Sequence, residues 1–202
     1  YVEATYVAQI GETKYTTLAE AIAAAQNGDE IVLLADVNGD LNLPANVILA
    51  GNGKQITGTL YLLGNTTFKG HVKANAFDFE NVGTEINIPE GATLEITGTG
   101  RMIIGHGCTF NITGTITDAK TANVADITPS LIMPGASFTG AGVTFNVTNA
   151  YIKTTASYCS SSKSASGTFD FNINNSIWEQ FGKLAFEAQS TAATVNFELK
   201  DS

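Results

Sequence analysis

The chain has 202 residues, which is enough for one domain with a sizeable core, and only 14% of them are charged against 44% hydrophobic. The net charge is −9 and Arg101 is the sole arginine in the sequence. This balance argues against a nucleic-acid partner or an anionic membrane surface, because both require clustered Lys and Arg. No apolar stretch is long enough to span a membrane.

The first thirty or so residues predict a β-hairpin. Residues 6–10 and 15–17 read as two short strands, and Gly11 lies in the turn between them. The surface of the rest of the chain must then be covered by Thr, Asn, Ser and Gly, since charges are so few.

A single helix is predicted over residues 18–26. Thr17 and Glu20 have the spacing of a capping box at its start, and Gly28 is expected to end it in a left-handed conformation. Leu18 and Ile22 lie on its apolar face. We expect this face to cover the open end of whatever structure begins at residue 31.

From residue 31 onward, apolar side chains alternate with Asn, Thr, Asp or Glu, which predicts strands with one buried face. The strand phrases recur at fixed intervals. Phe145, Phe171 and Phe197 each begin a similar phrase and are 26 residues apart. The tetrapeptide Ile-Thr-Gly-Thr also occurs at 56–59, 96–99 and 112–115.

Self-similarity of this kind indicates stacked units, here made of strands. We therefore predict an all-β parallel β-helix, a solenoid, with residues 1–30 as hairpin and capping helix and residues 31–202 as the stack. The first two tetrapeptides then lie two turns apart, and the third requires a short turn. A β-sandwich or jelly roll is the alternative, although it predicts two-residue hairpin turns that are few in this sequence.

The phrase from Tyr6 through Gly11, Tyr15 and Leu18 to Ile22, followed by 28–37, resembles the opening of many large bacterial surface proteins. In those proteins it caps a right-handed, single-stranded parallel β-helix of the pectin-lyase-like kind. The resemblance implies a secreted or cell-surface bacterial protein that has lost its signal peptide. It implies no particular reaction, since function belongs to sites rather than folds.

Pectin-lyase-like enzymes use a basic residue with Asp-bound calcium, or paired Asp residues, and the sequence shows neither pattern. The nearest approach to a carboxylate site is formed by Asp78, Glu80 and Glu95. Asp78 and Glu80 alternate onto one face about 7 Å apart, and Glu95 could stack close by. The alternative interpretation is that these are ordinary outward polar positions, which keep a solenoid soluble.

Outward aromatic side chains are candidates for stacking on sugars. Tyr151 and Trp178 occupy similar places in successive repeats and could form an aromatic strip, and Tyr158 begins a Ser-rich stretch that reads as a loop over 158–167. Core or corner packing of these rings is the alternative. The candidate carbohydrate-binding residues are thus Tyr151, Trp178 and Tyr158.

The remaining reactive side chains suggest neither a metal site nor a cofactor. His106 and Cys108 lack a second His or Cys nearby to complete a tetrahedral site, and no phosphate or dinucleotide fingerprint is present. Whether Cys108 and Cys159 pair is left open by the sequence.

These observations favour a non-enzymatic extracellular or cell-surface protein that acts as a scaffold or adhesin-like binding module. Its partners would be surface glycans or a host or matrix protein. The alternatives are a carbohydrate-binding module and a polysaccharide-degrading enzyme. Phage-fibre and ice-binding solenoids are the remaining alternatives. The last repeat stops at Asp201 and Ser202, so we expect an end-to-end or edge contact over residues 190–202, or a longer stack.

Overall fold

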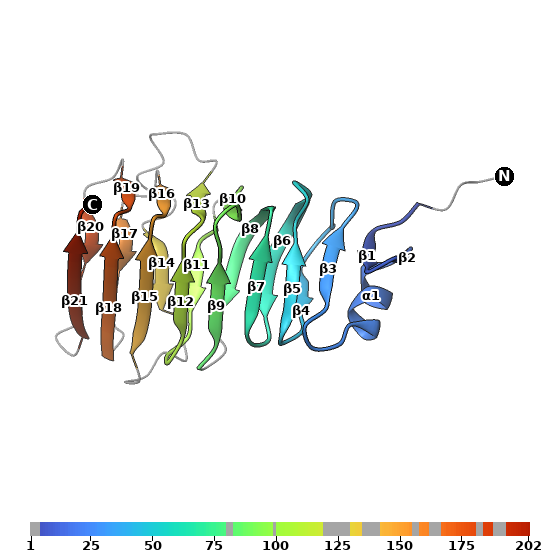
Figure 1. The fold of residues 1–202 in the computed structure, drawn as a ribbon, viewed down its shortest axis with the longest axis horizontal. Coiled ribbons are helices and arrows are strands. Elements are labelled where there is room, and N and C mark those ends of the chain that lie inside the picture. The colour runs from blue at the N-terminus through green and yellow to red at the C-terminus, as the bar shows by residue number, and fades with distance from the viewer. Residues whose placement is uncertain are drawn as a thin grey trace.

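The alternation of apolar and polar residues is realised as parallel strands in a computed structural model. This structure describes residues 5–79, 83–98, 100–118, 130–134, 142–154, 158–161, 167–180, 184–187 and 193–202. In these residues the protein is mostly β, with one short helix, α1 (Leu18–Ala24). The strands lie side by side along an elongated body, with α1 and the N-terminal hairpin at one end and β21 at the other (Figure 1).

The first sheet forms one long side of the body and has 10 strands within the described residues, in the order β2-β1-β3-β5-β7-β9-β12-β15-β18-β21. Its members are β1 (Ala8–Ile10), β2 (Thr13–Tyr15), β3 (Glu30–Leu33), β5 (Val47–Ala50), β7 (Thr66–Lys69), β9 (Glu85–Ile88), β12 (Thr109–Ile112), β15 (Val143–Thr148), β18 (Gly167–Asn174) and β21 (Ala193–Lys200). From β3 to β21 every neighbouring pair is parallel.

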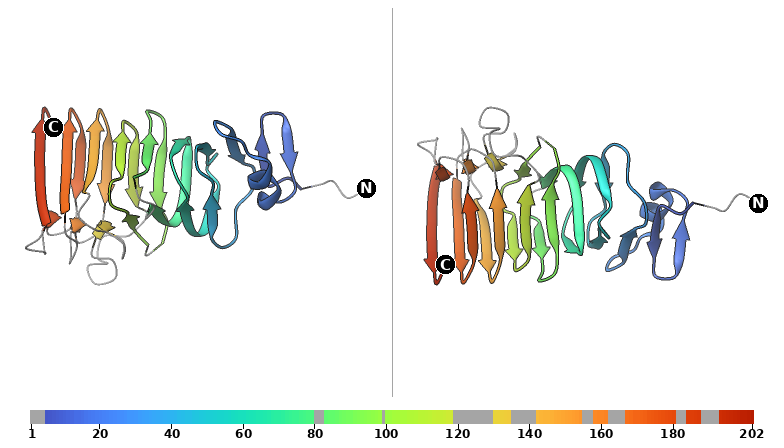
Figure 2. Two further views of the ribbon diagram at one scale, coloured as in Figure 1. Left: turned by 90° about the horizontal axis from the view of Figure 1, so that it is seen from below. Right: turned by 90° about the horizontal axis from the view of Figure 1, so that it is seen from above.

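The second sheet faces the first and divides at β8 (His71–Phe79) (Figure 2). One arm, the near arm, continues through β10 (Thr93–Ile96), β13 (Thr115–Asp118), β16 (Tyr151–Thr154) and β19 (Ile177–Gln180). The other, the far arm, continues through β11 (Met102–Ile104), β14 (Ser130–Pro134), β17 (Tyr158–Ser161) and β20 (Leu184–Glu187). Before β8 lie β6 (Gln55–Leu62) and β4 (Leu41–Leu43), which pair with each other in parallel.

The chain visits these layers in a fixed order. From β9 onward a strand of the first sheet is followed by one of the near arm and one of the far arm, and the next strand of the first sheet then pairs with the one before it. Strand β8 serves both arms by itself: its first residues pair with β10 and its last with β11. Ala76 and Phe77 are both buried, so the alternation breaks there and marks the corner between the arms.

The predicted column of phenylalanines is confirmed. Phe145 pairs with Phe171, and Phe171 with Phe197, in parallel register, so equivalent residues 26 positions apart lie side by side. Phe110 heads the same column through its pairing with Phe145. Phe110 and Phe145 thus lie on neighbouring strands of the first sheet although they are 35 positions apart in the chain.

The Ile-Thr-Gly-Thr repeat follows the prediction only in part. Ile56 and Ile96 both pair with Ala74, so the first two copies share one column of the second sheet, two strands apart. Ile112 instead pairs with Ile88 in the first sheet. The expected short turn before the third copy is wrong, because the third copy belongs to the first sheet and the first two copies belong to the second.

The hairpin and the capping box at the N-terminus are confirmed, although the second strand is Thr13–Tyr15 rather than 15–17 because the turn after Ile10 is shorter than predicted. β1 pairs antiparallel with both β2 and β3, and the Thr17 hydroxyl accepts a hydrogen bond from Glu20 N while the Glu20 side chain accepts from Thr17 N. The helix is shorter than predicted. Ala25 is extended (ψ 136°) and ends it, whereas Gly28, with φ 88°, turns the chain three residues later.

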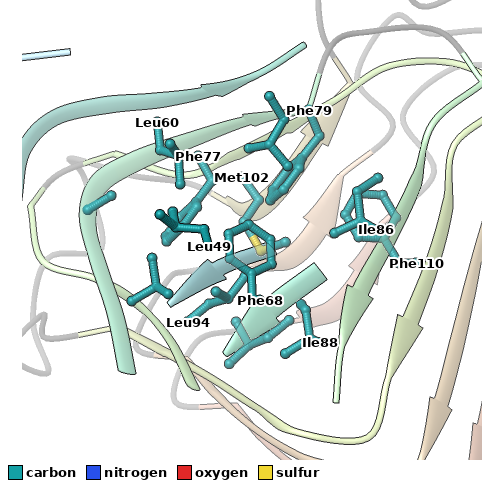
Figure 3. Packing of buried hydrophobic residues seen from close by; sticks show 14 of the residues in the cluster. Leu49, Leu60, Phe68, Phe77, Phe79, Ile86, Ile88, Leu94, Met102 and Phe110 are labelled. Atoms are coloured by element: carbon teal, nitrogen blue, oxygen red, sulfur yellow. The ribbon is translucent and has the colours of Figure 1, made fainter. Parts of the chain in front are cut away.

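The apolar interior extends between the sheets and reaches the helix. Ala21 is the fully buried residue of α1, while Leu18 and Ile22 are half-buried against the same cluster. Aromatic rings fill the middle of this interior (Figure 3): Phe68 meets Phe77 edge-on at 6.2 Å, and Phe79 meets Phe110 edge-on at 5.2 Å. This packing fixes which face of each strand is left for solvent.

Candidate binding surface

A ladder of asparagine side chains runs along the outer face of the first sheet. It consists of Asn87 on β9, Asn111 on β12, Asn146 on β15 and Asn172 on β18, which are neighbours in the parallel register. The Nδ2 atoms of Asn111, Asn146 and Asn172 each donate to the Oδ1 of the preceding asparagine at 3.0 Å. We call these four residues the asparagine ladder.

The ladder arises because parallel, in-register strands bring identical side chains to the inter-strand spacing of about 4.8 Å, at which amides bond to one another. Each amide is thereby held in one orientation. An amide has two N–H donors and two carbonyl lone pairs, so these bonds leave further hydrogen-bonding capacity on the ladder. The result is a regular row of fixed polar groups.

A second outward column flanks the ladder. It runs in register through Glu85, Thr109, Thr144, Asp170 and Asn196. Asn111 Nδ2 also donates to Glu85 Oε1 at 3.0 Å, and Asn196 Nδ2 donates to Asp170 Oδ1 at 2.8 Å. Between Glu85 and Asp170 this column carries only the hydroxyls of two threonines, so the middle of the face is polar and uncharged.

The three predicted carboxylates do not form a cluster. Asp78 lies on the last part of β8, in register with Ile103 of the far arm, whereas Glu95 lies on the near arm beside Lys73. The expectation that Glu95 stacks near Asp78 is therefore wrong, because β8 turns a corner between the two positions. Glu80 lies outside the described residues.

Glu95 has a different neighbour instead. His71 Nε2 lies 2.6 Å from Glu95 Oε2, and the two side chains are 40% and 21% exposed. His71 is in register with Thr93, two residues from Glu95 along β10, so the contact crosses the strands diagonally. A single carboxylate with one imidazole lacks the second carboxyl that glycoside hydrolysis uses.

The aromatic strip of Tyr151 and Trp178 is also wrong. Tyr151 is in register with Ile177, and Trp178 with Ile152, whose side chain is buried. Successive residues of a strand point to opposite faces, so Trp178 turns inward, where its ring meets Phe171 at 6.4 Å. Tyr158 starts β17, which pairs with β14 and β20. The loop expected from residue 158 is thus a strand at its beginning, and the Tyr158 side chain lies outside the described part.

Tyr151 takes part in a small polar group on the near arm. Its hydroxyl donates to Glu179 Oε2 at 2.8 Å, and Lys153 Nζ lies 3.5 Å from the same oxygen. The hydrogen bond to Glu179 raises the pKa of the Tyr151 phenol above its ordinary value. Ile177, in the same column as Tyr151, is 61% exposed.

Cys108 is buried, and its Sγ lies 3.3 Å from the Thr84 hydroxyl and donates to Phe79 O at 3.6 Å. The side chain of Cys159, its candidate partner, is outside the described residues. In the described part of the chain, no three His, Cys, Asp or Glu side chains gather closely enough to hold a metal ion. The same residues include no helix long and apolar enough to cross a membrane.

Sequence reasoning missed the asparagine ladder, although its signal was present. The phrase Phe-Asn-Ile or Phe-Asn-Val recurs at 110–112, 145–147 and 171–173. These asparagines read as ordinary outward positions until the register shows that they are neighbours.

Comparison with known proteins finds no matching family model, and neither a curated protein nor a solved structure matches the chain.

Proposed function

We propose that the chain is a right-handed, single-stranded parallel β-helix with a hairpin and helix at its N-terminal end. Two observations support this. Parallel partners recur once per passage through the three strand layers, and the antiparallel hairpin ends the first sheet beside β3. Strand crossovers between parallel partners are right-handed in nearly all proteins.

On this architecture we propose a non-enzymatic role as an extracellular or cell-surface scaffold, an adhesin-like module that presents a rigid face to a glycan-bearing or matrix partner. The asparagine ladder is the observation that carries the proposal. Four amides hold one another at 3.0 Å, so the polar groups of this face are already ordered before a partner arrives. Ordering before binding lowers the entropic cost of association.

Further support comes from chemistry and composition. The described carboxylates Asp78 and Glu95 lie on different arms of the second sheet, which does not favour hydrolysis. A surface of Asn and Thr with few charges suits a secreted solenoid, and residues 6–37 resemble the caps of bacterial surface proteins. These features support an extracellular or cell-surface location as part of the proposal.

The test is a binding screen of the purified chain against immobilised mucin glycoproteins, extracellular-matrix proteins and a glycan array. A variant carrying Thr109→Arg and Thr144→Arg puts two bulky cations beside the ladder on neighbouring strands. Its matched control carries Thr93→Arg and Thr115→Arg, which are also neighbours but lie on the near arm. Circular dichroism checks that both variants keep the fold.

Binding to at least one immobilised partner is expected, with a loss of about ten-fold or more in the first variant and little change in the control. Equal effects of the two variants would remove the ladder face from the proposal. Release of reducing ends or unsaturated products from polysaccharides would show an enzyme instead.

A further inference from the structure

A shallow depression of about 290 Å³ lies on the outer face of the first sheet, at the end nearer the hairpin. Three neighbouring strands form it, and each contributes two outward residues from adjacent columns. These pairs are Asn46 and Ile48 at β5, Asn65 and Thr67 at β7, and Glu85 and Asn87 at β9. The depression adjoins the asparagine ladder, since Asn87 is the first residue of the ladder.

The backbone beneath the depression is tied into the stack. Asn46 has a positive φ of 60°, its N–H donates to Asn65 O at 2.7 Å, and its carbonyl accepts from Gly28 N at 2.7 Å. Asn65 Oδ1 accepts from Glu85 N at 2.8 Å. The polar groups around the depression are therefore mounted on a fixed frame.

The lining combines donors and acceptors in a balanced set. Asn65 and Asn87 each use their Oδ1 as an acceptor within the protein, which leaves both Nδ2 groups as donors toward the depression. Glu85 Oε1 accepts from Asn111 Nδ2, and this leaves Oε2 as an anionic acceptor. Thr67 adds a hydroxyl that both donates and accepts. Ile48, half-buried, supplies an apolar floor.

We propose that this depression binds one residue of a neutral sugar. Adjacent sugar hydroxyls both donate and accept, so they match a carboxylate oxygen that lies among amide donors, and the apolar face of the ring would rest on Ile48. The size of the depression suits a single ring, and the open face lets a longer glycan continue along the sheet.

Charge selects neutral over acidic sugars at this position. The lining contains no Lys or Arg. The nearest lysine of β7, Lys69, is held by Glu30 at 2.8 Å. A uronate carboxylate would meet Glu85 with no cation to offset the repulsion, in a protein whose net charge is already −9. This inference rests on the proposed function in that it gives the presented face one specific ligand class.

The experiment titrates the whole chain with four probes: mannopentaose, cellopentaose, galactotetraose and trigalacturonic acid. Affinity is measured by calorimetry, and the side-chain NH₂ signals of Asn65 and Asn87 are followed by NMR, with Asn42 on β4 of the second sheet as the reference away from this face. Glu85→Gln keeps the acceptor for Asn111 but removes the charge. Thr67→Val removes a hydroxyl at constant shape. Thr115→Val makes the same change on the near arm of the second sheet, away from the ladder face.

At least one neutral probe is expected to bind and to shift the Asn65 and Asn87 signals but not that of Asn42. Glu85→Gln should weaken the binding about ten-fold and Thr67→Val about five-fold, with Thr115→Val unchanged. The proposal is overturned if no neutral probe binds at millimolar concentration, if trigalacturonic acid binds best, or if both depression variants behave as the unmodified chain. In those cases the proposed scaffold function would still hold if the chain binds a matrix protein and the variant with Thr109→Arg and Thr144→Arg loses that binding.

Discussion

Asn146 Nδ2 donates a hydrogen bond of 3.0 Å to Asn111 Oδ1, which joins two residues 35 positions apart in the chain. Asn146 also accepts from Asn172 Nδ2 at 3.0 Å. Its amide is therefore held from both sides, and the ladder behaves as one connected network rather than as separate surface amides.

Replacing this central residue tests the network. Asn146→Ala removes two hydrogen bonds at a partly buried position, and we expect the free energy of unfolding in urea to fall by about 1–2 kcal/mol. Asn42→Ala is the control, since Asn42 is an exposed strand residue whose side chain makes no hydrogen bond within the described residues. Its effect should stay within about 0.5 kcal/mol. Equal losses in the two variants would show that the ladder adds no stability.

The corner between the first sheet and the near arm gives a second prediction. Asn149 has φ 51°, and its Oδ1 accepts from Asn175 Nδ2 at 2.7 Å. Asn149→Gly loses only the side-chain bond, whereas Asn149→Ala also strains the left-handed backbone, so alanine should be worse than glycine by about 1 kcal/mol. At Thr144, which lies within a strand, the glycine variant should instead be less stable than the alanine variant. Thermal unfolding of the four variants measures both differences, and a common order at the two sites would contradict the assigned corner.

The phenylalanine column provides a comparison between two members of the same stack. Phe145 is fully buried, with its ring stacked on Phe110 at 4.7 Å and on Phe171 at 4.8 Å. Phe197 is 46% exposed. Phe145→Ala should cost about 3–5 kcal/mol, and Phe197→Ala should cost much less in the isolated chain. If a partner covers β21, Phe197→Ala should instead weaken association, which light scattering detects.

The fourth prediction concerns acid. Hydrogen bonds from Thr17 and Thr16 lower the pKa of Glu20 below its ordinary value. A lowered folded-state pKa stabilises the fold above the unfolded pKa, and this stability is lost as pH falls through the folded pKa. Thr17→Ala should therefore lower the melting temperature at neutral pH, and the difference from the unmodified chain should shrink in acid. Thr13→Ala, in the exposed strand of the hairpin, should show a difference that does not depend on pH.

The elements predictable from sequence were those set by local chemistry or strict repetition. The capping box of Thr17 and Glu20 is a matter of spacing, and the 26-residue interval from Phe145 to Phe197 fixes the column that the structure contains. At the end of this column, Phe197 and Leu199 of β21 are 46% and 55% exposed. The contact expected over residues 190–202, of which 193–202 are described, stays a prediction.

The parts that sequence did not reveal depend on register and corners. Trp178 and Tyr151 seemed equivalent by position in the repeat, yet a shift of one residue sends a side chain to the opposite face. Asp78 and Glu95 are separated by a corner inside β8, and the sequence of β8 contains no Gly or Pro that would predict this corner. The ladder and the depression likewise depend on which outward residues become neighbours. This is set by the number of residues between successive strands of the first sheet, which differs from one pair of strands to the next.

The 26-residue spacing of Phe145, Phe171 and Phe197 has a consequence for how the length of such a protein can change in evolution. Removing or duplicating one such unit in frame leaves each remaining phenylalanine facing another phenylalanine, as in the pairs Phe145–Phe171 and Phe171–Phe197. A gene can therefore lengthen or shorten this region by recombination without inventing a new interface. An insertion of any other length would have to lie between strands to leave this register intact.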